Sequence, residues 1–184
     1  MEIMRIRFLV FLSILLAGYL APRPGEAELP SPTEYEVKAA FLYNLAKFIE
    51  WPRGTLMDPA TPFNIGVLGE SSMFEALSAI SEKTIKDHRL NVQHLTTDSK
   101  LDSCHILFID RTILDVDPIL SQLQGSKTLT VGESIDFNQK GGLVNFIIID
   151  NHIGFEINQK RAERAGFMIS SKLLSLARIT INAR

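Results

Sequence analysis

The sequence predicts a single α/β domain, a three-layer sandwich with a mixed, mostly parallel sheet and an antiparallel hairpin near the C-terminus. Two observations carry this prediction. Short apolar strands alternate with helical segments along the chain, the pattern of a parallel sheet covered by helices. Residues 141–158 (GGLVNFIIIDNHIGFEIN) predict two strands joined directly, because Asp150 and Asn151 tolerate the positive φ that a tight hairpin turn needs.

The two strands of this hairpin differ in pattern. Residues 143–149 are almost continuously apolar, typical of a strand covered on both faces, and we expect this strand at the centre of the sheet. The second strand alternates, so that Phe155 faces the core while Glu156 and Asn158 face the other way. We expect that other face to be open to a neighbouring molecule.

Residues 1–27 predict a secretory signal peptide. Arg5 and Arg7 precede an apolar core, and the segment ends in prolines followed by Gly25-Glu26-Ala27. A retained membrane anchor is the alternative, but an anchor needs about 20 apolar residues and this core is shorter. Cleavage after Ala27 leaves an extended leader, residues 28–33, and one domain, residues 34–180. The predicted location is the periplasm, with no part of the cleaved chain embedded in a membrane.

The first helix is predicted to begin at Glu34, with Thr33 as its cap, and to end before Pro52. At 100° per residue, one apolar face should pack on the sheet. Tyr43 lies among small and polar residues on the opposite face, so we expect it to be partly exposed. It is either an ordinary surface tyrosine or a contact for a second subunit or partner. The predicted apolar face consists of Val37, Phe41, Leu45, Phe48 and Ile49.

The middle of the chain predicts a strand at residues 63–68, a turn at Gly69 and a helix over residues 71–80 begun by a serine cap. Backbone amides around Ser71 and Ser72 could hold a small anion at this helix start. Further strands are predicted at residues 89–95, 106–109 and 128–131, a turn at 135–139, and helices at 115–124, 159–165 and 170–177. Leu173, Leu174, Leu176 and Ala177 are expected to form the buried side of the last helix.

The sequence nominates no catalytic constellation, cofactor or metal, and we interpret the protein as a non-enzyme. Asp110 ends a buried strand as a receiver-domain phosphoacceptor does, but the first strand lacks the acidic pair of that site, which favours a turn or cap role. The four histidines lack the short spacings of metal ligands, and no serine lies in a G-x-S-x-G motif. The formal net charge of −2 comes with no basic patch for nucleic acid. Cys104 is the only cysteine, which excludes a disulfide within the chain and leaves a buried thiol or an intermolecular disulfide.

Three segments resemble one family. They are EYEVKAAFLYNLAKFIEWP near the start, CHILFID in the middle, and GGLVNFIIIDNHIGFEINQKRAERAGFMISSKLLSLARI at the end. In this order they are similar to the YfiR family of bacterial periplasmic proteins, from about Glu34 to Ile179. Residues Asp87-His88-Arg89 depart from the pattern, which expects a glycine before the arginine.

The resemblance implies a periplasmic repressor that binds the periplasmic region of an inner-membrane diguanylate cyclase and thereby lowers cyclic di-GMP and biofilm formation. It also implies a homodimer. The partner-binding residues we expect are Glu156, Asn158, Phe155 and Ala162, with Tyr43 second. For Glu156 the alternative is a salt bridge to Arg161 or Arg164.

Two other functions stay open. A small-molecule sensor would place its ligand at the carboxyl edge of the sheet, near Gly69, Ser71, Ser72 and Asp110, where open α/β sheets bind ligands. An exported hydrolase is the other, but the sequence nominates no side chain for the chemistry.

Overall fold

The computed structural model describes residues 31–69, 72–177 and 179–180. The predicted signal peptide, residues 28–30 of the predicted leader, and Ser71 lie outside these residues. From Pro32 onward, the described residues belong to one compact unit. Within it, no helix has both the length and the apolar composition needed to cross a membrane.

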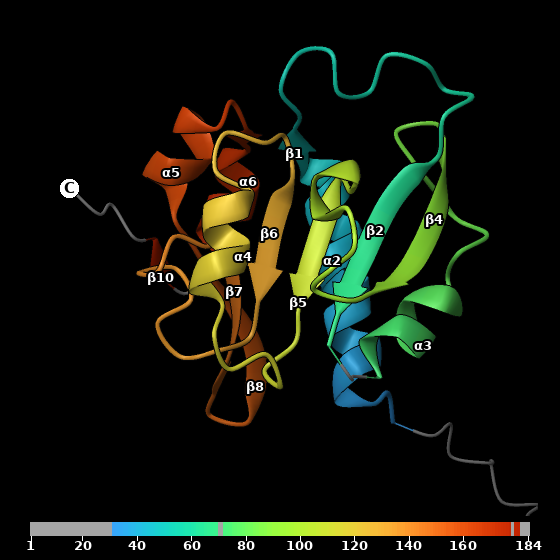
Figure 1. Ribbon diagram of the computed structural model, residues 1–184. Coiled ribbons are helices and arrows are strands. Elements are labelled where there is room, and N and C mark those ends of the chain that lie inside the picture. The colour runs from blue at the N-terminus through green and yellow to red at the C-terminus, as the bar shows by residue number, and fades with distance from the viewer. Residues whose placement is uncertain (1–30, 70–71, 178, 181–184) are drawn as a thin grey trace, which may run out of the picture. The chain divides into compact units, whose positions relative to one another are not determined.

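An eight-stranded sheet forms the middle layer (Figure 1). Five neighbouring strands, β4, β2, β5, β6 and β7, are parallel, and their chain order across the sheet is 2-1-3-4-5. β8 pairs antiparallel with β7, and β3 antiparallel with β4. From edge to edge the strands are β10 (Ile179–Thr180), β8 (His152–Ile157), β7 (Val144–Ile149), β6 (Leu129–Gly132), β5 (Ile106–Ile109), β2 (Phe63–Leu68), β4 (His88–Leu95) and β3 (Thr84–Ile85).

Helices cover both faces of this sheet, with α2 on one face and α4 on the other (Figure 1). The predicted mixed α/β sandwich with a C-terminal antiparallel hairpin is therefore confirmed. A second, two-stranded antiparallel sheet, which the sequence patterns did not reveal, joins β1 (Ile49–Glu50) to β9 (Met168–Ile169). The helices are α2 (Glu34–Phe48), α3 (Met73–Ser78), α4 (Asp117–Gln122), α5 (Gln159–Arg164) and α6 (Ser171–Leu176), with a 3₁₀ turn at Leu101–Ser103.

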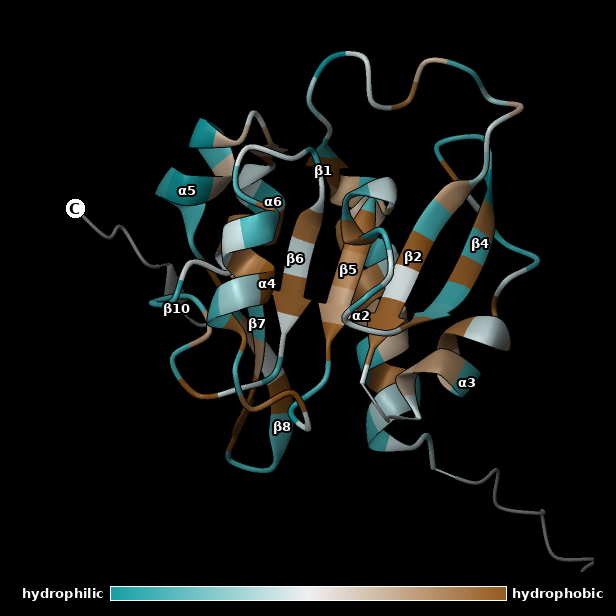
Figure 2. Cartoon of the chain, in the orientation of Figure 1, coloured by the Kyte–Doolittle hydropathy of each residue, from teal (hydrophilic) through white to brown (hydrophobic). Residues whose placement is uncertain are grey.

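The central strands β5 and β6 are buried along their whole length, and β5 is brown throughout in Figure 2, because each face of these strands packs against a helical layer. In β5, Ile106 and Phe108 belong to the core under α2, while Leu107 and Ile109 belong to the core under α4. This alternation follows from the two-residue period of a strand. Cys104 is buried as well, and burial raises the pKa of its thiol.

The predicted start of α2 is confirmed, but its predicted buried face is partly wrong. Thr33 and Glu36 form a reciprocal capping box around the first turn. The buried residues are Lys38, Ala39, Leu42, Leu45 and Ala46, whereas Phe48 is 39% exposed. The buried stripe of α2 differs from the predicted one for two reasons. Ala39 and Ala46 are small and allow close approach to the sheet, and the polar residue Lys38 is buried with its charge paired.

The hairpin turn is confirmed, since Asp150 and Asn151 have φ of +50° and +61°. The predicted central position of its first strand is wrong, because β7 lies third from one edge. β6 pairs with β7 only at Val144 and Asn145, whereas β8 pairs with all of β7. The far half of the hairpin therefore projects beyond the sheet, and Ile148 is 56% exposed.

The last helix, α6, is capped by Ser170 as predicted, its hydroxyl accepting the N–H of Leu173 at 3.2 Å. Leu173 is buried, but Leu176, which was expected on the same side, is 59% exposed. The chain leaves the helix at Ala177 in an extended conformation, and Leu174 and Ala177 are only partly buried against the core.

Candidate functional site

The candidate site lies at the carboxyl edge of the parallel sheet. The chain passes from β2 to β4 on one side and then crosses to β5 on the other, which makes the gap between β2 and β5 a topological switch point. Open α/β sheets place their ligands beyond the carboxyl ends of the strands at such a point. Asp110 and Glu133 follow β5 and β6 directly, and the first turns of α2 reach both of them.

A buried ion cluster, comprising Glu34, Tyr35, Lys38, Asp110, Arg111 and Glu133, occupies this edge. Its centre is Lys38, which is 2% exposed and contacts the carboxylates of Glu34 and Glu133. The side chain of Glu133 is 3% exposed. A lysine is buried so deeply only when its charge is paired, and here two carboxylates meet it.

Tyr35 connects the two acids at the strand ends. Its hydroxyl lies 3.3 Å from Oδ2 of Asp110 and 3.2 Å from Oε1 of Glu133, so its single proton is donated to one of them at a time. Arg111 Nη2 donates to the same hydroxyl oxygen at 3.4 Å. Asp110 also accepts the N–H of Thr112 at 2.8 Å, which confirms its predicted turn role.

Burial sets the ionisation of this cluster. It raises the pKa of Tyr35 to about 12, with the nearby charges of Glu133 and Asp110 adding to the effect. Burial also raises the pKa of Glu133, and the hydrogen bond from Lys38 opposes that rise. The pKa of the more exposed Glu34 is lowered, chiefly by its hydrogen bond from Lys38.

The cluster can orient and neutralise charge. Its six described members include no serine or cysteine that could act as a nucleophile. The described residues also include no group of three or more His, Cys, Asp or Glu side chains placed to hold a metal ion. Arg111 differs from the rest, because its side chain is 55% exposed. It is the member of the cluster most available to a bound molecule.

A groove of about 610 Å³ opens beside the cluster. We call it the carboxyl-edge groove; Lys38, Arg111, Glu133, Asn138, Asn145 and Glu156 are among the residues that line it. Within the described part of the chain, neither side-chain polar atom of Asn138 has a hydrogen-bond partner, and neither does Oδ1 of Asn145. These asparagines are 2% and 4% exposed. A buried polar atom without a partner is costly, so these amides are candidate hydrogen-bonding groups for a water or a bound molecule.

Glu156 lies in this groove, half-buried, directly across the hairpin from Asn145. The salt bridge to Arg161 or Arg164 considered above is not among the ion pairs of the described residues. Two apolar side chains of the same groove are exposed, Ile148 at 56% and Ile135 at 88%. The groove therefore combines a carboxylate, an accessible guanidinium and exposed aliphatic surface.

Three other residues expected to bind a partner are buried, and Asn158 departs from the open strand face on which it was predicted. Phe155, Asn158 and Ala162 are 1%, 4% and 0% exposed. Asn158 caps α5 by accepting the N–H of Arg161 at 3.1 Å, and its Nδ2 donates to the carbonyl of Asn138 at 3.2 Å. These side chains hold the hairpin to α5, so a partner cannot reach them in this conformation.

Tyr43 is half-buried, as expected, and its contacts are internal. Its hydroxyl donates to the carbonyl of Thr84 at 3.0 Å, which attaches α2 to β3. The ammonium groups of Lys47 and Lys83 each lie 5.3 Å from the centre of its ring. A partner contact by Tyr43 remains a prediction.

The structure brings two of the four predicted ligand residues together. A Cβ added to Gly69, whose φ is +102°, would lie 2.8 Å from Cβ of Asp110. Ser72 is exposed at the start of α3 and makes no side-chain cap hydrogen bond, and this helix has only six residues. Neither Gly69 nor Ser72 lines the carboxyl-edge groove, and a ligand bound at these residues remains a prediction.

Sequence reasoning missed Tyr35, Lys38 and Glu133. A faint signal exists for one of them, because Glu34 and Lys38 are spaced i,i+4, as ion pairs on a helix are. Glu133 comes directly after a buried strand and therefore falls at the carboxyl edge. Nothing in the local pattern indicates that this edge and the start of α2 meet.

Comparison with known proteins places the chain by sequence and by fold. A family model described as YfiR/HmsC-like matches residues 35–178. A conserved domain protein of Vibrio cholerae O1 biovar El Tor is similar in structure, with a TM-score of 0.59, 12% identity, and coverage of 81% of this chain and 60% of the other. An ABC domain of Streptococcus pneumoniae, solved in complex with L-Trp, has a TM-score of 0.51 at 17% identity over 80% and 60% of the two chains. Both likenesses concern the fold alone, and this chain spans about 60% of either structure. A search of curated proteins found no significant match.

Proposed function

The chain belongs to the YfiR/HmsC-like family, and from this membership we propose that it is a periplasmic regulator that binds and represses an inner-membrane diguanylate cyclase. Family membership supports a regulatory role in the periplasm in general, and repression of a cyclase is the specific form proposed. The protein would bind the periplasmic region of the cyclase and lower cyclic di-GMP and biofilm formation. Repression by binding requires a higher affinity for the inactive state of the cyclase than for its active state.

The unpaired carboxylate of Glu156 is the observation that supports a protein contact. Its carboxylate makes no side-chain hydrogen bond or ion pair with another described residue. Ile148 and Ile135, both exposed, line the same groove. An unpaired charge with apolar neighbours suits a partner that offers a basic side chain and an apolar one. We assign the contact to this part of the carboxyl-edge groove.

The test compares two charge reversals. Glu156→Lys should weaken binding to the periplasmic region of the cyclase by at least about tenfold, the scale of losing a charged contact and gaining a repulsive one. Glu82→Lys makes the same change at an exposed glutamate that does not line the groove, and should weaken binding less than about twofold. Circular dichroism and thermal unfolding check that both variants fold. Unchanged affinity of the first variant would contradict this assignment.

A second change tests the apolar part of the contact. Ile148→Ser removes an exposed aliphatic side chain without altering charge. We expect weaker binding with little loss of stability, because the side chain buries surface only when the partner is bound. Affinity equal to that of the wild type would restrict the interface to Glu156.

The orphaned atoms of Asn138 and Asn145 favour a second candidate function, a small-molecule sensor. A ligand that both donates and accepts hydrogen bonds would satisfy these amides, and it would stabilise the folded state that binds it. Thermal unfolding in the presence of a set of periplasmic metabolites tests this function. A rise in midpoint that Asn145→Leu abolishes supports it, and unchanged midpoints across the set count against it.

A further inference from the structure

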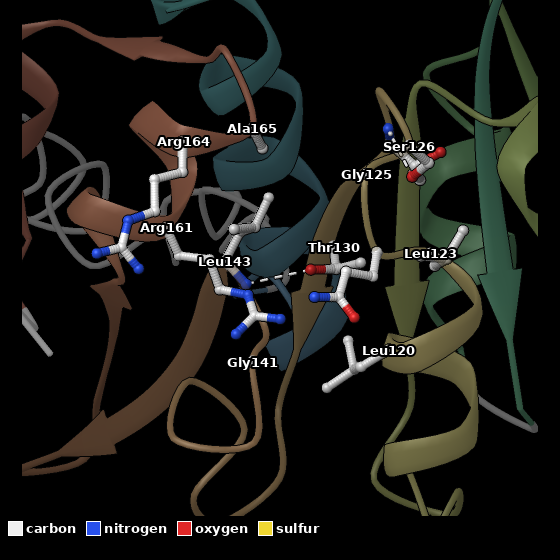
Figure 3. Close-up of a pocket in the computed structure, with 12 residues that line it drawn as sticks. Leu120, Leu123, Gly125, Ser126, Thr130, Gly141, Leu143, Arg161, Arg164 and Ala165 are labelled. Carbon is white, nitrogen blue, oxygen red and sulfur yellow. Dashed lines mark hydrogen bonds between the residues drawn. The ribbon is translucent and has the colours of Figure 1, made fainter. Parts of the chain in front are cut away.

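A second cavity, of about 310 Å³, lies at the opposite end of β6 (Figure 3). Its walls come from the C-terminal end of α4, the start of β6, the segment before β7 and the C-terminal end of α5. Glu133 and the carboxyl-edge groove are beyond the other end of the same strand. We call this cavity the arginine pocket, after Arg161 and Arg164.

The charges of the arginine pocket are of one sign. Arg161 and Arg164 line it, and its lining includes no aspartate or glutamate. Neither guanidinium forms an ion pair with a carboxylate among the described residues. A guanidinium carries five N–H donors and no acceptor, so an anion is the natural complement of this lining.

The guanidinium of Arg161 fits where it does because Gly141 has no side chain. It packs on Gly141, where an added Cβ would lie 2.8 Å from its Cζ and Nη2. Gly141 also has a φ of +114°, which other residues rarely adopt. In Figure 3 this guanidinium points into the pocket between Gly141 and Leu120, while that of Arg164 points away from them. Arg164 can therefore serve as a control for the role of Arg161 in the pocket.

The remaining walls combine a hydroxyl with aliphatic surface. The hydroxyl of Thr130 accepts the N–H of Leu143 at 3.1 Å, which leaves its own proton to donate. Leu120 and Leu123 belong to the core under α4 and also line the pocket. A ligand could thus place anionic oxygens at Arg161 and an apolar group against these leucines.

We propose that the arginine pocket binds a small organic anion whose carboxylate or phosphate oxygens meet Arg161 and whose apolar part lies against Leu120 and Leu123. A planar guanidinium binds two such oxygens through parallel hydrogen bonds. The volume is at the lower end of ligand pockets, which favours a small ligand. This site is separate from the groove assigned to the cyclase, so either assignment can fail alone.

Calorimetric titration of the exported protein with benzoate tests the proposal. Benzamide, which has the same ring and no charge, controls for apolar binding, and inorganic phosphate tests the other source of anionic oxygens. Arg161→Gln should weaken benzoate binding at least about tenfold, the scale of a lost charge-assisted pair. Arg164→Gln removes the same charge one turn along the helix and should cost less than about threefold, through long-range attraction alone.

Phosphate binding that depends on Arg161, without benzoate binding, supports the anion site and assigns it to phosphate oxygens. Equal binding of benzoate and benzamide overturns the proposal, as does equal weakening by the two arginine variants or absence of binding by both anions. Arg161→Gln should keep the unfolding midpoint of the wild type, because no side-chain hydrogen bond or ion pair of Arg161 to another described residue is lost.

Discussion

Lys38 of α2 and Glu133 at the end of β6 form an ion pair in which each side chain is only 3% exposed. The pair joins a helix to a strand end 95 residues away along the chain. Glu34 is the second carboxylate on the ammonium group and is 37% exposed. The buried charge of Glu133 therefore depends on Lys38, and removing the lysine has consequences that can be measured.

We expect Lys38→Met to destabilise the protein by about 3–5 kcal/mol near neutral pH, the usual effect of leaving one charge of a buried pair uncompensated. Methionine keeps the aliphatic length, so lost packing contributes little. Urea unfolding monitored by circular dichroism measures the change. Lys47→Met, at an exposed lysine of the same helix, is the matched control and should cost less than about 1 kcal/mol.

The effect of Lys38→Met should also depend on pH. Burial already raises the pKa of Glu133, and without Lys38 the pKa rises further. A raised pKa in the folded state means that the variant is most stable below the ordinary pKa of the carboxyl and loses stability as pH rises through the raised value. The stability difference from the wild type should therefore shrink between about pH 7 and about pH 5. A difference that is constant with pH would contradict the burial of an ionised Glu133.

Tyr35 provides a spectroscopic prediction. Its pKa is raised from 10.0 to about 12, so the stability contributed by its neutral phenol is present below pH 10 and is lost as pH rises through about 12. Titration of the ultraviolet absorbance of phenolate should show this late step, and Tyr35→Phe should remove it. The variant should also lose about 0.5–1.5 kcal/mol of stability for each net hydrogen bond lost. Loss of the phenolate signal near pH 10 in the variant, with no step near pH 12 in the wild type, would show that Tyr35 ionises as a surface tyrosine.

The elements of this fold were more predictable than the site. The strand bounds of β2 and β5 follow directly from apolar runs that end at Gly69 and Asp110. The hairpin turn follows from Asp150 and Asn151, whose side chains favour the positive φ they adopt. These features depend on residues close in sequence, so local physical chemistry is sufficient to predict them.

The buried cluster was not predictable for the converse reason. Lys38 is a charged residue in a helix, and its local pattern indicates exposure; only Glu133 makes its burial favourable. The position of β7 was misjudged because a continuous apolar run indicates burial on both faces, while its far half extends beyond β6. Contacts across the sheet decide both cases, and no short window of sequence contains them.

Phe137 offers a packing prediction. Its ring is fully buried between two glycines, and a Cβ added to Gly142 or Gly132 would lie 2.0 Å or 2.5 Å from ring atoms. Gly142→Ala should therefore destabilise the protein by about 1–3 kcal/mol through overpacking. Phe137→Leu in the same chain should cost less than it does alone, because the smaller side chain makes room for the methyl group. Strict additivity of the two changes in urea unfolding would contradict this contact.

The asparagines of the carboxyl-edge groove connect stability to function. Asn138 and Asn158 are 2% and 4% exposed, but both side-chain polar atoms of Asn138 lack partners within the described residues, whereas both of Asn158 are hydrogen-bonded. Each unpaired buried group costs about 1–3 kcal/mol. Asn138→Leu should therefore stabilise the free protein, as replacement of a binding-site residue often does. Asn158→Leu should destabilise it by about 1 kcal/mol or more, since it removes the cap of α5. If Asn138 serves to bind a molecule, urea unfolding should show changes in the free energy of unfolding of opposite sign for the two variants. Destabilisation by both would show that Asn138 serves the fold, and would remove the main support for a ligand in the groove.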